Sequence, residues 1–166
     1  MDDLRVQPMT AAEFGEFRSR LIRDYAADQV RAGNWAAADA EDRAASQTDG
    51  LLSEGVRTPG MLLLTARTAD GRRAGHVRVA LRGPAGDGGA WISDIEIAAE
   101  QRGRGYGRAL LAAAEREAAR RGARALALNV FGPNAVARGL DESAGYKVTT
   151  LQMRKELTDG GGPWGA

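Results

Sequence analysis

A run of glycines alternating with larger residues, Gln101-Arg-Gly-Arg-Gly-Tyr-Gly107, constrains the fold of this chain more than any other feature. It joins a segment with strand character, Ala90 to Ala98, to a segment with apolar residues at helical spacing, Gly107 to Arg121. Glycine allows a ligand to approach the backbone closely, and consecutive amides at the start of a helix attract anions. Three arginines add positive charge to this loop: Arg102, Arg104 and Arg108. The pattern therefore predicts an α/β sheet with a pyrophosphate site at this connection.

Several kinds of nucleotide site could use such a loop. A Walker loop requires a lysine followed by Ser or Thr after its last glycine, and this stretch has no lysine. A dinucleotide fold requires Gly-x-Gly-x-x-Gly in the first strand–helix turn. Here the glycines are spaced Gly-x-Gly-x-Gly and lie far into the chain, which disfavours that fold. The remaining candidate is the pyrophosphate of an acyl-coenzyme A.

The rest of the chain is predicted to alternate between strands and helices within one domain, residues 1–157, with residues 158–166 as a flexible tail. Thr10 and Glu13 have the spacing of a capping box and predict a first helix that ends at Gly33-Asn34. Asn34 is expected to cap a second helix from Trp35 to about Gln47. The other predicted helix spans 134–144, the predicted strands span 4–9, 61–67, 74–81, 124–131 and 146–156, and a flexible loop is expected over 83–89. The order of elements predicts a mixed α/β sheet.

Composition excludes several classes of protein. The chain has 166 residues with no cysteine and one histidine, which excludes disulfides, thiolate sites and multi-histidine metal cages. No apolar stretch approaches the length of a membrane span, and the first residues lack the pattern of a signal peptide. We therefore expect a cytoplasmic protein without a membrane partner. The formal net charge of +1 gives no reason to expect nucleic acid as a partner.

The loop and the segments around it resemble one known family. Arg102-x-x-Gly105-x-Gly107 resembles the Q/R-x-x-G-x-G/A signature of the GNAT superfamily of N-acetyltransferases. Downstream, Asn134-x-x-Ala-x-x-Leu140 followed by Gly145-Tyr146 is similar to the second half of the family's pattern. The resemblance covers roughly Met61 to Leu157. It implies a sheet that is splayed at its centre and flanked by about four helices.

The resemblance also implies how a co-substrate binds. Acetyl-coenzyme A would lie where the strands over 90–98 and 124–131 splay apart, without a metal. The backbone groups of Ile95 and Ile97 would pair with the pantetheine arm. Asn129 and Asn134 would lie beside the cofactor, and Asn134 could equally be a helix cap. The pyrophosphate would be held by Arg102, Gly103, Arg104, Gly105, Tyr106, Gly107 and Arg108.

Two positions at which relatives often carry catalytic side chains differ here. The resemblance expects a tyrosine that protonates the leaving thiolate, and this chain has Asp141; where some relatives carry a glutamate, it has Asn129. Tyr25 and Tyr146 are substitute donors, although Tyr146 equally fits a packing role. An ionised aspartate donates no proton, so Asp141 could act as the acid only if its pKa were raised well above its reference value of about 3.9.

The candidate bases are Glu96, Asp94 and His76. By strand alternation, Asp94 and Glu96 share a face opposite Ile95 and Ile97. Two carboxylates on one strand face are costly unless they are solvated or paired. Both an active-site cleft and ion pairs with arginine would explain them. We prefer Glu96 as the base, with Asp94 as a supporting charge.

The sequence thus predicts an enzyme that transfers an acetyl group to a primary amine of a small molecule or peptide. A module that binds acyl-coenzyme A without chemistry is the main alternative, because the expected tyrosine is absent. An arginine-rich helix near Arg116 and Arg120 could contact nucleic acid, but Glu115 and Glu117 interleave with it. A homodimer is compatible with the family and leaves no signal in the sequence.

Overall fold

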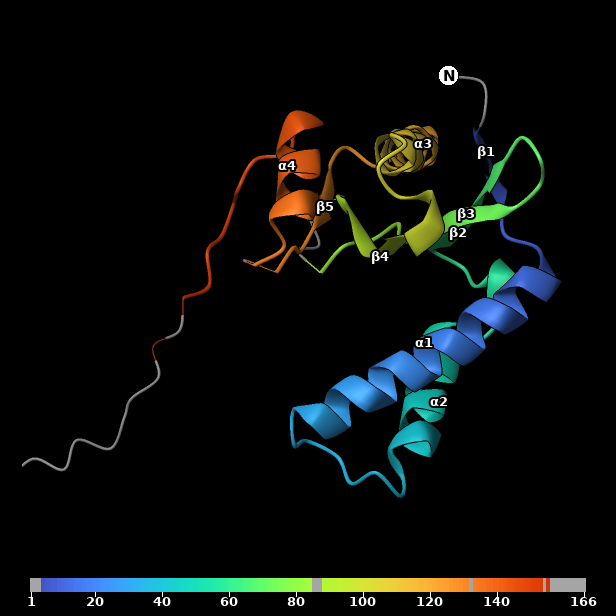
Figure 1. Ribbon diagram of the computed structural model, residues 1–166, viewed down its shortest axis with the longest axis vertical. Helices are drawn as coiled ribbons and strands as arrows, with labels where there is room; N and C mark the ends of the chain where they lie inside the picture. The colour runs from blue at the N-terminus through green and yellow to red at the C-terminus, as the bar shows by residue number, and fades with distance from the viewer. Residues whose placement is uncertain (1–3, 85–87, 132, 154, 156–166) are drawn as a thin grey trace, which may run out of the picture.

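The centre of the structure, a computed structural model, is one sheet in the order β1-β2-β3-β4-β5 (Figure 1). The model describes residues 4–84, 88–131, 133–153 and 155, and in this part the sheet has five strands. The strands are β1 (Leu4–Pro8), β2 (Met61–Thr68), β3 (Arg73–Ala80), β4 (Ala90–Ile97) and β5 (Leu126–Leu128). The α-helices are α1 (Ala11–Arg31), α2 (Ala40–Leu51), α3 (Tyr106–Arg120) and α4 (Ala135–Ser143). Two 3-10 turns, η1 (Gly55–Arg57) and η2 (Ala99–Gln101), complete the described elements.

The sheet opens between β4 and β5. Strands β1 to β4 pair antiparallel in sequence order, and β5 runs parallel to β4. The parallel pairing holds over three residue pairs only and ends at Ile92 opposite Leu128. Beyond this point, among the described residues, β4 continues to Ile97 with β3 as its single partner. The expected splay is therefore present, but in the described part of the sheet it lies between β4 and the edge strand β5 and not at the centre, and one edge of β4 is open along it.

A β-bulge sets the faces of β4. The register with β3 shifts between Arg78 and Val79, so that Asp94 lies opposite Arg78 and Ile92 lies opposite Val79. The residue that the bulge adds is Ser93. Ile92 and Ile95, three positions apart, therefore both pack with the core beneath α3. Asp94 and Glu96 line a pocket beneath α1, on the other face of the sheet.

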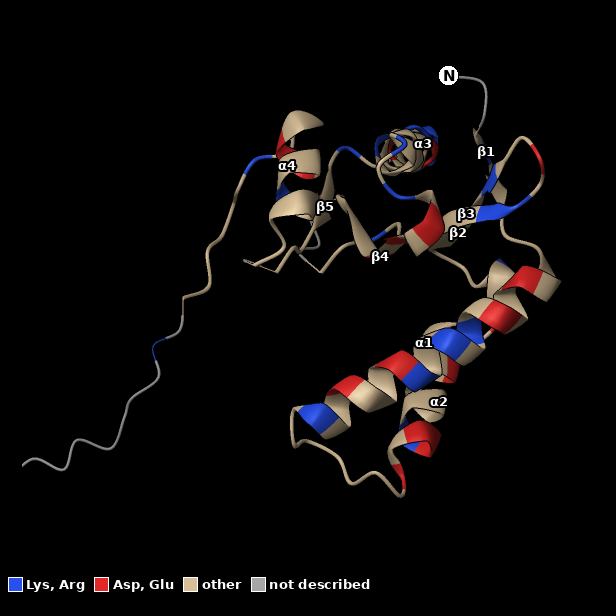
Figure 2. Cartoon of the chain, in the orientation of Figure 1, with Lys and Arg blue, Asp and Glu red and all other residues tan. Residues whose placement is uncertain are grey.

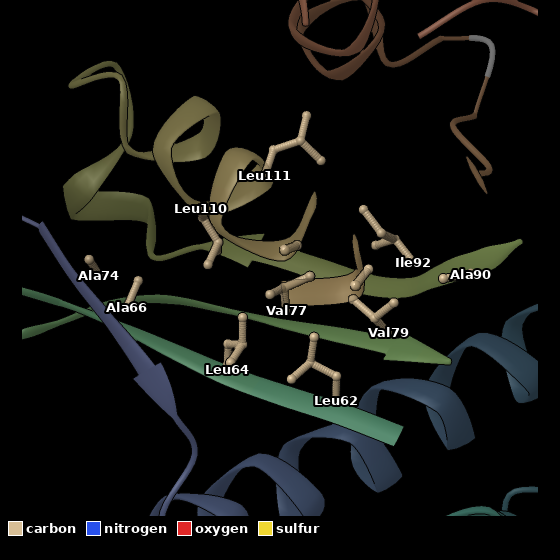
Figure 3. Packing of buried hydrophobic residues seen from close by; sticks show 12 residues of the cluster. Leu62, Leu64, Ala66, Ala74, Val77, Val79, Ala90, Ile92, Leu110 and Leu111 are labelled. Carbon is tan, nitrogen blue, oxygen red and sulfur yellow. The ribbon is translucent and has the colours of Figure 1, made fainter. Parts of the chain in front are cut away.

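The helices cover the two faces of the sheet. Leu110 and Leu111 of α3 are buried against β-strand side chains that include Leu64, Val77 and Val79 (Figure 3). On the opposite side, Phe17 of α1 belongs to a smaller cluster of buried residues with Met9, Leu52 and Leu63. Helices α1 and α2 pack against each other on this side (Figure 1). None of the helices in the described part has the length and apolar character that a membrane crossing requires.

Some predicted element boundaries are confirmed and others are wrong. The capping box is present: the Thr10 hydroxyl accepts from the Glu13 amide, and the Glu13 carboxylate accepts from the Thr10 amide. The second helix does not begin at Trp35 but at Ala40, after an N-cap at Asp39. Asn34 is not its cap, because its side chain donates to Gln29.

Two strands predicted for the C-terminal part differ from the structure. The strand expected over 124–131 is confined to β5, and the predicted last strand over 146–156 is not formed in its described residues, 146–153 and 155. Those residues leave α4 in an extended path that pairs with no strand (Figure 1). The predicted tail over 158–166, and residues 85–87 of the predicted loop over 83–89, lie outside the described residues.

Gly75 should be required for the pairing of β3 with β4. A Cβ atom at this position would lie 2.3 Å from the backbone oxygen of Glu96 and 2.8 Å from the side chain of Ile97. Relief of these contacts requires the strands to separate, so Gly75→Ala should destabilise the fold by about 1–3 kcal/mol. Denaturant unfolding measures this, with Gly15→Ala as the control. Gly15 has open space around it on α1, and its replacement should stabilise the fold by about 0.5–1 kcal/mol. Equal stabilities of the two variants would contradict the β3–β4 geometry.

Candidate active site

A pocket of about 320 Å³ lies between α1 and the strands β3 and β4. We call it the α1 pocket. Helix α1 presents charges of both signs along its length (Figure 2), and two of its aspartates, Asp24 and Asp28, reach the pocket. The full lining is Phe17, Arg20, Leu21, Asp24, Tyr25, Asp28, His76, Arg78, Ser93, Asp94 and Glu96. All three predicted base candidates are therefore in one place, although they come from two strands.

His76 is held between two charged groups at the wall of the α1 pocket. Its ring is 3% exposed. An Arg73 guanidinium nitrogen lies 2.6 Å from Nδ1, and the Asp94 Oδ2 lies 2.6 Å from Nε2. The Phe17 ring packs edge-on against the imidazole, with ring centroids 4.9 Å apart. Both ring nitrogens of His76 therefore have hydrogen-bond partners within the protein.

The two carboxylates of β4, those of Asp94 and Glu96, differ in the hydrogen bonds and ion pairs that they form within the protein. Asp94 is bound to His76, and 31% of its side chain is exposed. Glu96 is 39% exposed, and the Arg20 Nη1 lies 4.0 Å from its Oε2. Its distance of 3.9 Å to the His76 Nδ1 is too long for a hydrogen bond. Glu96 is thus the carboxylate with more of its hydrogen-bonding capacity open to a ligand in the α1 pocket.

Arg78 adds a buried cation to the same wall. Its Nε is buried without a hydrogen-bond partner among the described residues. Burial lowers the pKa of its guanidinium, while the charge of Asp94 acts in the opposite direction. A ligand group that accepts a hydrogen bond would satisfy this nitrogen.

The glycine-rich loop folds as an anion site would require. It follows β4 through η2, and Gly105 is the N-cap of α3 with a φ of +80°. A Cβ atom there would meet open space, so the requirement for glycine comes from the backbone conformation and not from crowding. The first amides of α3 face outward from this cap with the helix dipole behind them.

The arginines of this loop are not equivalent. The Arg102 Nε donates to the backbone oxygen of Ile97 at 3.0 Å, which ties the loop to the end of β4. Arg108 donates to the backbone oxygen and the hydroxyl of Ser143, at 3.2 and 2.5 Å, and so connects α3 to α4. Arg104 has no side-chain partner among the described residues. It is therefore the arginine of the loop that is available to a bound anion.

The predicted residues of the C-terminal half lie at the end of β5, on α4 and directly after α4. Asn129 is exposed directly after β5. Asn134 caps α4, because its Oδ1 accepts from the Ala137 amide at 3.1 Å. Asp141 is partly buried on α4, and burial raises the pKa of its carboxyl. Burial, reinforced by the negative charge of Glu115, raises the pKa of the Tyr146 phenol strongly.

Comparison with known proteins decides the family. Residues 21–146 match the family described as "Acetyltransferase (GNAT) family". The chain is 30% identical to YycN of Bacillus subtilis, described as an uncharacterized N-acetyltransferase, over 93% of this chain and 99% of that one. The chain belongs to the GNAT acetyltransferase family. The resemblance of the loop and of α4 to that family is thereby confirmed.

Solved structures agree with this assignment. The crystal structure of YycN from Bacillus subtilis covers 94% of this chain and 99% of its own, with a TM-score of 0.77 and 29% identity. The structure of AAC(6')-Iy in complex with a bisubstrate analogue, CoA-S-monomethyl-acetylneamine, covers 93% of this chain and 98% of its own. Its TM-score is 0.65 at 16% identity, so this second likeness concerns the fold alone. The mixed sheet with four helices is therefore the GNAT fold.

Sequence analysis did not assign the arginines that lie beside the base candidates. Arg20, Arg73 and Arg78 were not among the predicted residues, yet they surround the imidazole and the carboxylates. Strand alternation from His76 would have placed Arg78 on the same face. Nothing in the sequence indicated Arg20, because its position depends on how α1 crosses the sheet. Among the described residues, no group of His, Asp or Glu side chains is arranged to hold a metal ion.

Proposed function

We propose that this chain transfers the acetyl group of acetyl-coenzyme A directly to a primary amine bound in the α1 pocket. The supporting observation is the position of β4. Its free edge borders the splay, its end leads into the glycine-rich loop, and its other face presents Asp94 and Glu96 to the α1 pocket. A thioester in the splay and an amine in the α1 pocket would therefore meet at one strand.

The co-substrate site is proposed for the edge of β4 and the loop after it. The backbone groups of Ile95 and Ile97 would pair with the pantetheine arm along the open edge. The amides from Arg102 to Arg108 would hold the pyrophosphate, with the Arg104 side chain as an added cation. Asn129 and Asn134 would contact the co-substrate from the side of β5 and α4. Structures of the same fold that hold coenzyme A or a bisubstrate analogue support a coenzyme A site in this chain.

The chemistry requires a neutral amine. Its nitrogen forms a bond to the acetyl carbonyl carbon, the carbon–sulfur bond breaks, and the thiolate leaves with the bonding electrons. The nitrogen then has one proton too many, and the thiolate lacks one. An amine that arrives as the ammonium ion must first lose a proton, and we assign Glu96 to take it, directly or through one water, because Glu96 is exposed to the α1 pocket and has no close ion-pair partner among the described residues. Asp94 would attract the cationic amine to the same point.

Catalysis can be tested by following the release of free thiol. Protein, acetyl-coenzyme A and a panel of primary amines are incubated, and products are identified by mass spectrometry. We expect thiol release that depends on one class of amine, with an acetylated amine formed in equal amount. Tight binding of acetyl-coenzyme A without any amine-dependent release would instead favour the binding module without chemistry.

Asp141 provides a prediction about the proton that the thiolate needs. It stands where family members often have a tyrosine, and burial raises the pKa of its carboxyl. As an ionised carboxylate, Asp141 would accept hydrogen bonds from a water or from the incoming amine and would have no proton to donate. We therefore expect Asp141 to orient a water or the incoming amine, and not to be the main proton donor.

The variants Asp141→Asn and Asp141→Tyr distinguish these roles. With a confirmed acceptor, Asp141→Asn should raise KM more than it lowers kcat, and Asp141→Tyr should hold or increase kcat. General acid catalysis is worth about 10²–10⁴-fold in rate. A loss of kcat of that size in Asp141→Asn, with KM unchanged, would show that Asp141 is itself the acid. Coenzyme A affinity, measured by calorimetry, serves as the control for both variants.

A further inference from the structure

Arg73, His76 and Asp94 form a chain of three side chains at the wall of the α1 pocket, and the proposed reaction uses only Asp94 among them. We propose that His76 is a positioning residue and not the base, because Arg73 fixes its tautomer and His76 in turn fixes the Asp94 carboxylate. This inference rests on the proposed function of the α1 pocket. It concerns which of the neighbouring groups can accept a proton there.

The tautomer follows from the donors and acceptors available. A guanidinium group can only donate hydrogen bonds, so the Arg73 nitrogen 2.6 Å away makes Nδ1 of His76 an acceptor. The hydrogen of the imidazole is then on Nε2, and it is donated to the Asp94 Oδ2, also at 2.6 Å. The free lone pair on Nδ1 that a base requires is already used by Arg73. Protonation of Nδ1 would place a second N–H against the guanidinium and break that contact.

The surroundings hold this arrangement in place. The imidazole is 3% exposed and has the Phe17 ring packed edge-on against it, so the ring cannot turn over without moving α1. Asp94 therefore has one oxygen bound by Nε2–H, and the carboxylate has a fixed orientation. Its remaining acceptor capacity is available to the ammonium group of an acceptor. Glu96, 3.9 Å from Nδ1 and not hydrogen-bonded to it, is left to take the proton.

The tautomer can be measured directly, because His76 is the only histidine among the 166 residues. Untagged protein labelled with ¹⁵N-histidine gives one imidazole, and long-range ¹H–¹⁵N correlation shows which nitrogen carries the hydrogen. At neutral pH we expect the hydrogen on Nε2 and none on Nδ1. A hydrogen on Nδ1 would overturn the proposal. This measurement needs no acceptor, so it stands even if the proposed function fails.

Replacement of Arg73 tests what holds the tautomer. In Arg73→Met the Nδ1 lone pair loses its hydrogen-bond donor, and we expect the ¹⁵N signal of Nδ1 to move away from its wild-type position. The matched control is Arg72→Met, because Arg72 is bound to Asp70 on the exposed turn before β3. The control should keep the wild-type spectrum, and identical spectra for both variants would contradict the role of Arg73.

The charged groups that face the imidazole or Arg73 come from three elements. They are Glu16, Arg20, Asp24 and Asp28 from α1, Arg78 from β3, and Asp94 and Glu96 from β4.

Kinetics with a confirmed acceptor separate positioning from base catalysis. His76→Phe keeps a ring against Phe17 but has no donor for Asp94, and we expect KM for the acceptor to rise about tenfold or more with a smaller loss of kcat. His76→Gln retains an N–H near the position of Nε2 and should recover most of the loss in KM. Loss of kcat in both variants, with KM unchanged and the lower limb of the pH profile removed, would identify His76 as the base. If His76→Phe does not fold, the comparison of His76→Gln with the wild type retains the same two outcomes.

Discussion

Aspartate in place of Gly105 is expected to weaken the binding of coenzyme A about 100-fold or more, which corresponds to about 2.8 kcal/mol. Two effects add. The N-cap of α3 has a φ of +80° at this residue, which a residue with a Cβ adopts only with strain. The new carboxylate would also lie among the amides proposed to face the pyrophosphate, where it would compete for their hydrogen bonds and repel the anion. Isothermal titration with coenzyme A measures the effect.

Gly122→Asp is the matched control for this prediction. Gly122 follows the other end of α3 and has a φ of +87°, so the variant introduces the same charge and a similar backbone strain far from the loop. It should lose a similar amount of stability and keep the affinity for coenzyme A. Equal affinities of the Gly105 and Gly122 variants would remove the loop from the co-substrate site. Arg104→Ala should have a smaller effect than Gly105→Asp, because an exposed charged contact is worth about 1 kcal/mol or less.

Glu96→Gln is expected to lower kcat about 10²-fold or more, since a positioned general base contributes about 10²–10⁴-fold. Glutamine retains the shape of the side chain but cannot accept the proton of the amine. The deficit should be largest at low pH and should shrink as pH rises, because more of the free amine is then already neutral. The measurement is the pH dependence of kcat/KM for wild type and variant with the same acceptor.

Glu54→Gln removes the same charge from an exposed position and controls for the change in net charge. Its pH profile should overlay that of the wild type. If the Glu96→Gln profile also overlays the wild type, a water path or a different residue carries the proton, and the assignment of Glu96 is wrong.

The parts of the site that could be predicted are those contained within one element. Asp94 and Glu96 share a face because a strand alternates, and both were expected to do so. The loop from Gln101 to Gly107 could be predicted because its backbone conformation requires glycine, and the spacing of the glycines can be read directly from the sequence. The wedge beside β4 came from the resemblance to the GNAT family, and the pairing of β4 with β5 shows the splay.

The parts that could not be predicted depend on contacts between elements. The start of the second helix was misplaced because its apolar face is mostly alanine, and such a face gives a weak periodic signal. Trp35 is not its first residue but packs against Tyr25 of α1, with ring centroids 5.3 Å apart. In the same way, the approach of Arg20 to Glu96 follows from the crossing of α1 over the sheet. The contact of Arg73 with His76 lies within β3, where a register shift with β2 between Arg73 and Gly75 brings the two side chains to one face, and simple strand alternation does not indicate it.

The predicted last strand failed for a related reason. Its sequence from Tyr146 onward has residues that favour strands, and Val148, Leu151 and Met153 are all exposed in the structure. A strand requires a partner, and no described strand pairs with this segment. Local preference is therefore insufficient to define a strand at this position.

A crystal structure with bound acetyl-coenzyme A tests the central claim most directly. We predict that the pyrophosphate lies on the amides between Arg102 and Arg108, and that the pantetheine arm runs along the open edge of β4 at Ile95 and Ile97. The thioester should then lie between β4 and β5, with its carbonyl carbon accessible from the α1 pocket on the side of Glu96. A pyrophosphate bound away from the loop, or a thioester with no path to the α1 pocket, would contradict the proposed reaction.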